Sequence, residues 1–178
     1  TSAAISAANF ASGVPVAYIS SGLVFPDALA GAPIAGKTGG PMLLVKSTEI
    51  PTAIATELNR LKPAKIVVLG GSATIADSVE GALASYTTGT VERWEGADRY
   101  AVSAGISAKA FPSGSPTVFV ASGAIFTDAL SGAPVAGKTP APLLLVKSSS
   151  IPTAVAAELT RLQARRIIVL GGPASVST

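Results

Sequence analysis

The chain is dominated by an internal duplication. Residues 1–77 align without a gap with residues 102–178, and roughly 43 of the 77 aligned positions are identical. A match of this quality indicates one structural unit present twice, because both copies keep the same order of apolar and polar positions. The joining segment, residues 78–101, occurs only once. We therefore expect two modules, residues 1–90 and 91–178, the first without its opening segment and the second without its C-terminal end.

Each copy alternates short apolar runs with helical patterns. Three buried parallel strands are predicted in the first copy, at 16–20, 41–46 and 65–69, with counterparts in the second copy. Helices are predicted over about 26–37, 52–61 and 75–86. Gly31 and Pro33 favour a short or kinked first helix. The order predicts an α/β fold of tandem repeated modules, each a small parallel sheet flanked by helices in a Rossmann-like, three-layer arrangement.

The joining segment has its own pattern. Residues 90–94 (TVERW) predict an edge strand, and Asp98 is placed to cap the N-terminus of a helix that continues into the second copy. The first copy has no such lead-in. We expect that both ends of the chain are cut from a longer array of repeats.

Composition excludes several classes of function. The 178 residues include no cysteine and no histidine, so disulfides, thiolate chemistry and the commonest general base and metal ligand are ruled out. No run of about 18 apolar residues occurs, so no membrane span is expected. The net charge of +3 is compatible with weak attraction to polyanions but does not demand nucleic-acid binding. We expect no catalytic residues, no metal and no cofactor.

Two acidic residues recur at a place where ligands often bind. Asp27 and Asp128 each follow the carboxyl end of a predicted strand, in the shared pattern S-G-x-x-F-x-D-A-L. Each is a candidate ligand contact, although an acidic residue that satisfies backbone donors at a helix start is the favoured interpretation. The other duplicated acids, Glu57 and Glu158, lie three residues before arginines and are interpreted as surface helical pairs.

Glycine pairs follow the last strand of each copy. Gly70 and Gly171 begin these pairs, where backbone N–H groups could hold a phosphate. Neither a third glycine at Rossmann spacing nor a GK[ST] sequence is present. Tight turns at the strand exits are therefore favoured over a nucleotide site.

Several cations lie at the ends of the predicted elements. These side chains could bind an anionic glycan, or they could simply extend into solvent at the element ends. Trp94 and Tyr100 lie beside two of them and suit a sugar platform, although packing between the modules is favoured. The candidate cations are Lys37, Lys46, Arg93, Arg99, Lys138 and Lys147.

Five motifs, in order, resemble one family. They are R-W-E-G-A-D-R-Y-A at 93–101, the following I-S, the S-G-x-x-F-x-D-A-L-[AS]-G-A-P segment, P-x-L-L-V, and the strand ending V-x-L-G-G. Together they resemble the cell wall binding repeat type 2 family of Gram-positive surface proteins. By motif, Arg93, Gly96, Asp98, Arg99 and Tyr100 match the opening signature. Asp27 and Asp128 match the central aspartate, while the Leu43–Leu44 and Leu144–Leu145 pairs match the leucine strand.

The resemblance implies a secreted anchor rather than an enzyme. Members of the family hold surface proteins on the envelope by binding an anionic secondary cell-wall polysaccharide. They usually carry three tandem repeats, packed with pseudo-threefold symmetry beside a separate functional region. The expected location is therefore extracellular, at the cell wall or cell surface, with the polysaccharide or further repeats as partners.

Two other functions stay open at this stage. The repeats could assemble with one another, as a possible homo-oligomer, into an extracellular layer or filament, because small modules with open apolar faces seek partners. An enzyme acting on a nucleotide or glycan has only the analogy of the α/β fold in its support.

Overall fold

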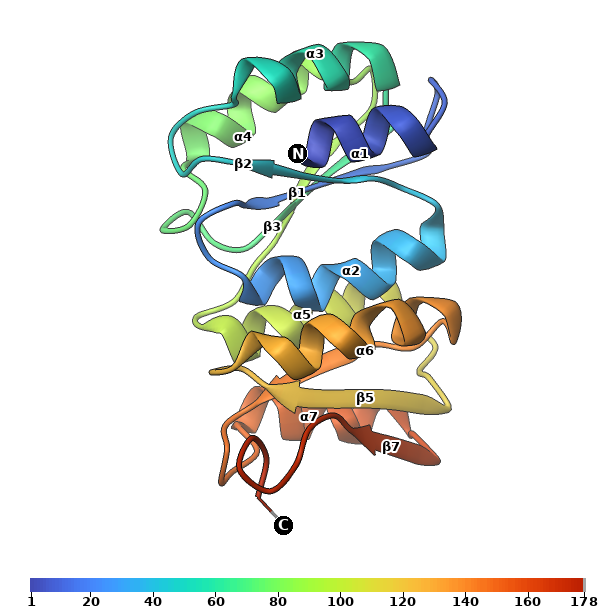
Figure 1. Ribbon diagram of the computed structural model, residues 1–178, viewed down its shortest axis with the longest axis vertical. Coiled ribbons are helices and arrows are strands. Elements are labelled where there is room, and N and C mark those ends of the chain that lie inside the picture. Colours follow the sequence, from blue (N-terminus) through green and yellow to red (C-terminus); the bar gives the residue numbers. More distant parts are fainter. Residues whose placement is uncertain (178) are drawn as a thin grey trace.

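Two parallel sheets, one from each copy, are stacked along the long axis of the molecule (Figure 1). The computed structural model describes residues 1–177. Helices cover both faces of each sheet, and α2, α5 and α6 fill the space between the two sheets. The α/β fold predicted from the alternation of strands and helices is confirmed. No helix formed by residues 1–177 is both long and apolar enough to cross a membrane.

The predicted elements from the first helix to the third strand appear in both copies at equivalent positions. In the first copy they are α1 (Ser2–Asn9), β1 (Ala17–Ser21), α2 (Pro26–Thr38), β2 (Met42–Val45), α3 (Thr52–Leu61), β3 (Ile66–Leu69), α4 (Asp77–Leu83) and a short 3-10 turn, η1 (Ala84–Tyr86). The joint forms β4 (Val91–Trp94). The second copy forms α5 (Arg99–Ala110), β5 (Thr117–Ser122), α6 (Phe126–Lys138), β6 (Leu143–Val146), α7 (Thr153–Leu162) and β7 (Arg166–Val169).

Strand β4 joins the sheet of the first copy, although it lies beyond residue 90. The order of that sheet is β2-β1-β3-β4, and Leu69 of β3 pairs with Trp94 of β4. The edge strand predicted for the joint is thus confirmed. The second sheet has the order β6-β5-β7, and within residues 1–177 no strand pairs with the outer edge of β7.

Helix α2 runs over almost the range predicted for it, from Pro26 to Thr38, with Gly31 and Pro33 inside it. The two residues therefore do not shorten the helix. Its glycine serves close packing, since a Cβ at Gly31 would overlap the Leu69 side chain of β3. Tertiary contact with the sheet therefore outweighs the low helix propensity of these residues.

A partly exposed arginine paired with a buried glutamate fastens the first helix of each copy to the helix after the second strand. Ser6 of α1 donates to Glu57 Oε1, and the Arg60 guanidinium donates to both oxygens of Glu57 and to the Phe10 carbonyl. Glu57 is buried, so the surface pair predicted for it is wrong. Hydrogen bonds from Arg60 hold the pKa of Glu57 below its usual range.

The second copy repeats this arrangement. Ser107, Glu158 and Arg161 form the same hydrogen bonds, and Glu158 is also buried. The interpretation of Glu158 as a surface partner is corrected in the same way. Sequence spacing showed the short-range pair but not the distant serine that brings the carboxylate into the interior.

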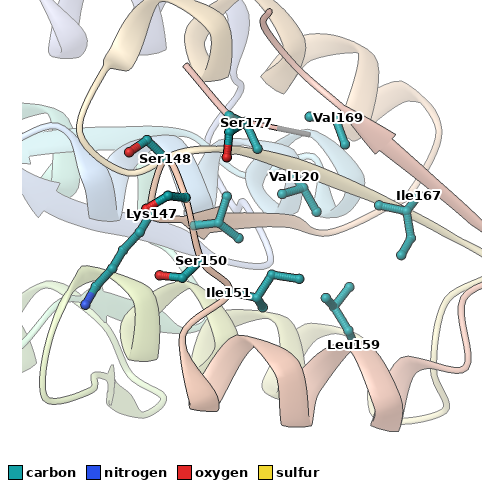
Figure 2. A pocket seen from close by; sticks show the side chains of 12 residues that line it. Val120, Lys147, Ser148, Ser150, Ile151, Leu159, Ile167, Val169 and Ser177 are labelled. Atoms are coloured by element: carbon teal, nitrogen blue, oxygen red, sulfur yellow. The ribbon is translucent and has the colours of Figure 1, made fainter. Parts of the chain in front are cut away.

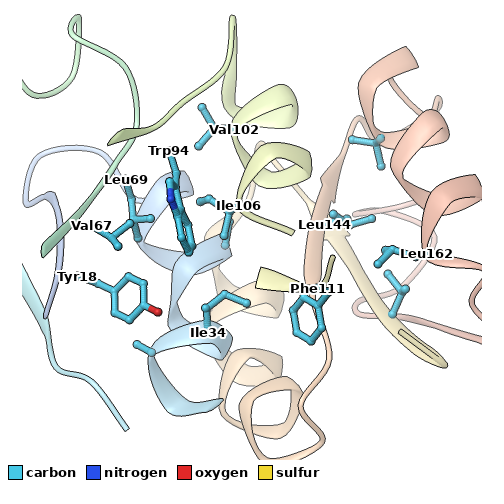
Figure 3. Packing of buried hydrophobic residues seen from close by; sticks show 14 of the residues in the cluster. Tyr18, Ile34, Val67, Leu69, Trp94, Val102, Ile106, Phe111, Leu144 and Leu162 are labelled. Atoms are coloured by element: carbon cyan, nitrogen blue, oxygen red, sulfur yellow. The ribbon is translucent and has the colours of Figure 1, made fainter. Parts of the chain in front are cut away.

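A shared apolar core joins the two copies (Figure 3). One face of the first sheet, the face on the side of the second copy, packs together with α2 against α5 and the second sheet. Trp94 packs edge-on against Tyr18, with ring centroids 6.1 Å apart. Members of this core from the two copies include Ile34, Val67, Leu69, Val102, Ile106, Phe111, Leu144 and Leu162.

Equivalent residues differ in exposure according to whether another copy covers them. Leu29 of α2 is 7% exposed because the second copy covers it, whereas its counterpart Leu130 of α6 is 55% exposed. Ile106 of α5 is 1% exposed against the first copy, whereas Ile5 of α1 is 59% exposed. The chain thus contains one complete junction and the two unmatched halves of another.

This difference predicts unequal costs for the same substitution. We expect Leu29→Ala to lower the free energy of unfolding by about 2 to 4 kcal/mol, because it leaves a cavity in the junction. Leu130→Ala is the matched control and should change it by less than about 0.5 kcal/mol, as usual for an exposed site. Urea unfolding followed by circular dichroism measures both, and equal losses would contradict the junction packing described here.

Candidate functional site

A crevice opens where the two copies meet, at the carboxyl edge of the first sheet. Strand β1 lies between β2 and β3, so the connections that follow β1 and β3 diverge to opposite sides at this edge. Such a switch point is where open α/β sheets bind ligands. The loop after β4 completes the crevice, whose volume is about 200 Å³. Its lining includes Pro26, Asp27, Gly71, Thr74, Gly96, Asp98 and Arg99.

Asp27 lies at the base of this crevice. Its side chain is only 5% exposed, and it forms no hydrogen bond or ion pair with any other group in residues 1–177. The capping role favoured from the sequence is therefore wrong. Asp27 lies inside the first turn of α2, and its carboxylate lies directly against Gly70 without bonding to the helix N–H groups. Burial raises the pKa of Asp27 to about 6, and the Arg99 charge opposes this rise.

The glycine that faces each aspartate is required for two reasons. Gly70 and Gly171 have φ angles of +102° and +100°, which side chains other than glycine rarely adopt. A Cβ at either position would also overlap Oδ2 of Asp27 or Asp128. These turns after β3 and β7 confirm the tight strand exits expected from the sequence, and they leave room for a carboxylate.

The opening signature forms the second wall of the crevice. Asp98 caps α5 as predicted, and its Oδ1 accepts from the N–H groups of Tyr100 and Ala101 at 2.9 and 2.8 Å. Arg99 donates to the Gly123 carbonyl at 2.6 Å, and its guanidinium carbon lies 5.9 Å from the Phe25 ring centre. A Cβ at Gly96 would overlap the backbone at the start of α5, so this position packs too closely for a side chain.

Three other signature residues hold the structure together. The Arg93 side chain is 9% exposed and donates to Glu80, to Asp77 and to the Gly70 carbonyl. Trp94 belongs to the shared core, and Tyr100 packs against that core and against the apolar cluster that contains Leu29 of the first copy. Packing between the modules, the interpretation favoured for both aromatic residues, is confirmed. Arg93 does not line the crevice, and its charge is already paired with the carboxylates of Glu80 and Asp77.

The candidate lysines fall at opposite edges of the sheets. Lys46 and Lys147 directly follow β2 and β6, at the carboxyl edge, and the strands of both sheets run toward the same side of the molecule (Figure 1). Lys46 pairs with Glu49 at 2.8 Å, with both side chains more than half exposed. Lys37 and Lys138 lie in the last turns of α2 and α6, and so at the amino edge.

Lys37 is an interface residue. Its ammonium donates to the Ala110 carbonyl at 2.9 Å and lies 4.0 Å from the Phe111 ring centre, both at the end of α5. Its counterpart Lys138 is exposed beside the groove between α2 and α6. The amino-edge lysines are thus far from the crevice, and one of them already holds the neighbouring copy.

The second copy has only part of the crevice. Asp128 is half-buried and, with Gly171, borders a broader hollow of about 520 Å³ between α6 and β7. No loop equivalent to 96–99 lies over it within residues 1–177. The duplicated aspartates and the single signature, which the sequence left as separate candidates, therefore meet at one site, on Asp27.

Another hollow of about 290 Å³ lies on the outer face of the second sheet (Figure 2). Its lining is mainly apolar, with Val120, Ile151 and Ile167 on its walls, and the Lys147 side chain extends away from them. In the first copy, α4 covers the corresponding face, where Ile66 is fully buried. This hollow therefore corresponds to a face that a helix covers in the first copy, and it is a weaker ligand site than the crevice.

Some crevice residues were not singled out by sequence reasoning. Thr74 donates to the Gly71 carbonyl and shapes the loop after β3, while Glu95 reaches the rim beside Gly71. Their position in the sequence could have identified them as site residues, because each follows the carboxyl end of a parallel strand. Across residues 1–177, no cluster of three acidic, cysteine or histidine side chains is arranged to hold a metal ion.

The sequence matches the model of cell wall binding domain 2 (CWB2) over residues 1–80 and 93–178. The chain belongs to the CWB2 family. Its two matches coincide with the two copies, and the fold described above is that of two CWB2 repeats. The resemblance noted from the five motifs is confirmed.

Relatives of this CWB2 chain include two Bacillus subtilis (strain 168) proteins. An amidase enhancer is 34% identical over 138 residues, which cover 78% of this chain and 18% of the enhancer. N-acetylmuramoyl-L-alanine amidase LytC is 30% identical over 162 residues, which cover 91% of this chain and 32% of the amidase. The CWB2 chain thus spans less than a third of the length of each.

Two solved structures from Clostridium difficile share the fold. Cwp8 superposes with a TM-score of 0.84 at 29% identity, covering 99% of this chain and 30% of Cwp8. Cwp6 superposes with a TM-score of 0.86 at 24% identity, covering 93% of this chain and 26% of Cwp6. Both CWB2 repeats, and not one alone, are therefore included in each match.

The buried carboxyl of the CWB2 crevice predicts a pH-dependent stability. The folded-state pKa of Asp27, about 6, lies above its ordinary value of 3.8, so folding favours the protonated form. Stability from this group is fully present below about pH 4 and is lost as the pH rises through 6. The loss amounts to about 3 kcal/mol at most.

Asp27→Asn removes this titration. We expect the stability of D27N relative to the unsubstituted protein to increase between pH 4 and pH 7, measured by urea unfolding at each pH. Asp128→Asn, in the incomplete crevice, is the matched control. An equal increase in both variants would show that the effect does not arise in the crevice.

Proposed function

We propose that this chain is a non-catalytic module that anchors a protein to the Gram-positive cell wall by binding an anionic secondary polysaccharide. Membership of the CWB2 family supports the cell wall as the partner. The observation that carries a specific site is the junction crevice, which joins Asp27 to the opening signature at the carboxyl edge of the sheet. The location that follows is extracellular, on the cell wall or cell surface.

The arrangement of cations supports an anionic polymer. Lys46 and Lys147 are exposed at the same edge as the crevice, one on each repeat, and neither is held by the core. Arg99 lies between them in the chain and lines the crevice itself. A polymer that crosses this edge would meet separated positive charges, and that spacing suits a chain with recurring anionic groups.

The carboxylates of the crevice support a binding role over catalysis. Hydrolysis of a glycosidic bond needs two carboxyl groups free to act as acid and as base or nucleophile. Asp27 is free, but Asp98 accepts hydrogen bonds from two backbone N–H groups of α5. The amidase function in the name of LytC is a property of that much longer protein.

A sedimentation assay on purified cell walls tests the proposal. We expect the protein to bind Gram-positive walls that retain the anionic secondary polymer, and to lose binding when the polymer is removed chemically. Because ion pairs with an exposed polymer are screened by salt, binding should weaken at high ionic strength. Equal binding to both wall preparations would contradict the proposal.

Replacement of the two carboxyl-edge lysines is the companion experiment. Lys46→Gln combined with Lys147→Gln should weaken wall binding severalfold and reduce its salt dependence. Lys62→Gln combined with Lys109→Gln, two exposed lysines at the ends of α3 and α5, is the charge-matched control. If the control lowers binding as much as the double variant does, net charge and not this edge governs attachment.

Self-assembly is the second candidate function, and the exposed apolar residues favour it. Leu130 and Val135 of α6 and Ile5 of α1 are more than half exposed, whereas their counterparts form the junction core. A second chain that offered its α1 face to α6 would reproduce contacts that already exist between the repeats. The contact is head-to-tail, so it forms a ring or an open filament.

Light scattering across a dilution series tests this candidate. If the faces drive self-assembly, the mean mass should rise with concentration, and Leu130→Glu should abolish the rise by placing a charge in the contact. Thr160→Glu, on the exposed side of α7, is the control for added charge. A mass that stays that of one chain at every concentration would exclude self-assembly.

A further inference from the structure

The crevice contains an almost buried carboxylate, that of Asp27, which keeps a small exposed surface and receives no hydrogen bond from residues 1–177. Asp27 is 5% exposed and lines the cavity, yet no hydrogen bond reaches its carboxylate from residues 1–177. Buried polar groups are normally hydrogen-bonded, and a carboxylate left without a donor in the interior is costly. Each of the other two large buried acids, Glu57 and Glu158, receives a serine and an arginine. Asp27 is therefore poised to receive hydrogen bonds from a ligand.

The charge around the cavity disfavours an anion there. Asp98 lines the crevice and Glu95 approaches its rim, so Asp27 and these two acids face a single cation, Arg99. The N-terminus of α5 would otherwise attract an anion. Asp98 already accepts from the N–H groups of that turn, so a phosphate or carboxylate would find those donors occupied.

The size and remaining walls suit a small polyol. The volume of about 200 Å³ is below the range of about 300 to 1,000 Å³ for pockets that hold drug-sized molecules. Val24, Pro26, Ala73 and Val102 supply apolar wall beside the acidic and basic groups. A sugar ring offers both kinds of surface, with hydroxyl donors on its edge and C–H groups on its faces.

We propose that the junction crevice binds one uncharged sugar ring of the wall polymer, whose hydroxyl groups donate to Asp27 and accept from Arg99. This rests on the proposed wall-binding function and divides its recognition in two. The crevice selects a neutral ring, and the polymer's anionic groups lie outside it, toward Lys46 and Lys147. Within residues 1–177 the role falls to the first aspartate, because no loop from that part of the chain closes over Asp128.

Titrations followed by amide NMR test the assignment with defined probes. Methyl glycosides of glucose, mannose and N-acetylglucosamine represent neutral rings, and glycerol phosphate represents the anion. We expect at least one glycoside to shift the amides of Gly71, Thr74 and Gly96, with glycerol phosphate shifting those near Lys46 and Lys147. Absence of crevice shifts with all three glycosides, or crevice shifts with glycerol phosphate, would overturn the inference.

The twin aspartates provide matched variants. Asp27→Asn keeps the shape but removes the charged acceptor, so glycoside affinity should fall at least tenfold. Asp128→Asn should leave it unchanged, and unfolding curves would verify that both variants are folded. If D27N retains full glycoside affinity, the inference is wrong.

Wall sedimentation of the same variants separates the two proposals. If the unsubstituted protein binds walls that carry the polymer and D27N binds them equally well, the crevice assignment fails while the anchoring function stands. If the unsubstituted protein fails to bind such walls, the anchoring function itself fails, whatever the glycoside titrations show.

Discussion

The structure depends on apolar packing between adjacent repeats. A sheet of three or four short strands has two apolar faces, and each repeat covers its own sheet with few helices. The face of the first sheet on the side of the second copy is covered by α2 together with α5, which belongs to the next repeat. Strand β4, from the same joining segment, completes the first sheet. The first sheet therefore gains part of its apolar cover and its fourth strand only when the following segment packs against it.

Much of the fold followed from local sequence patterns. The continuous apolar runs gave the strands, and the lone Asp98 before a helical pattern gave the N-cap of α5, because both signals act within a few residues. The reason for the glycine within α2 was not visible in the sequence, since Gly31 allows close contact with Leu69, a residue 38 positions away in the chain. The buried position of Glu57 was missed for the same reason: Ser6 is 51 residues distant.

The site was predicted in its parts but not in its assembly. Asp27 and the opening signature were both candidates, yet nothing in the spacing says that residues 96–99 close over Asp27. Arg93 shows the opposite case. Its charge suggested a ligand contact, but Arg93 instead donates to Glu80 and Asp77 of α4. These ion pairs hold the joining segment against the first copy. Local motifs identify which residues matter, and only tertiary contacts assign them to binding or to support.

The loop that closes over Asp27 comes from the following repeat, so complete crevices belong to junctions and not to repeats. An open chain of n repeats then has n − 1 complete crevices, and closure into a ring adds the last one. With one sugar bound per crevice, as proposed above, the number of binding sites rises from one in a two-repeat chain to three in a closed ring of three. Weak sites on one molecule bind a polymer more tightly together, because the first contact raises the effective concentration at the others. Closing the ring therefore increases avidity more than adding one repeat to an open chain does.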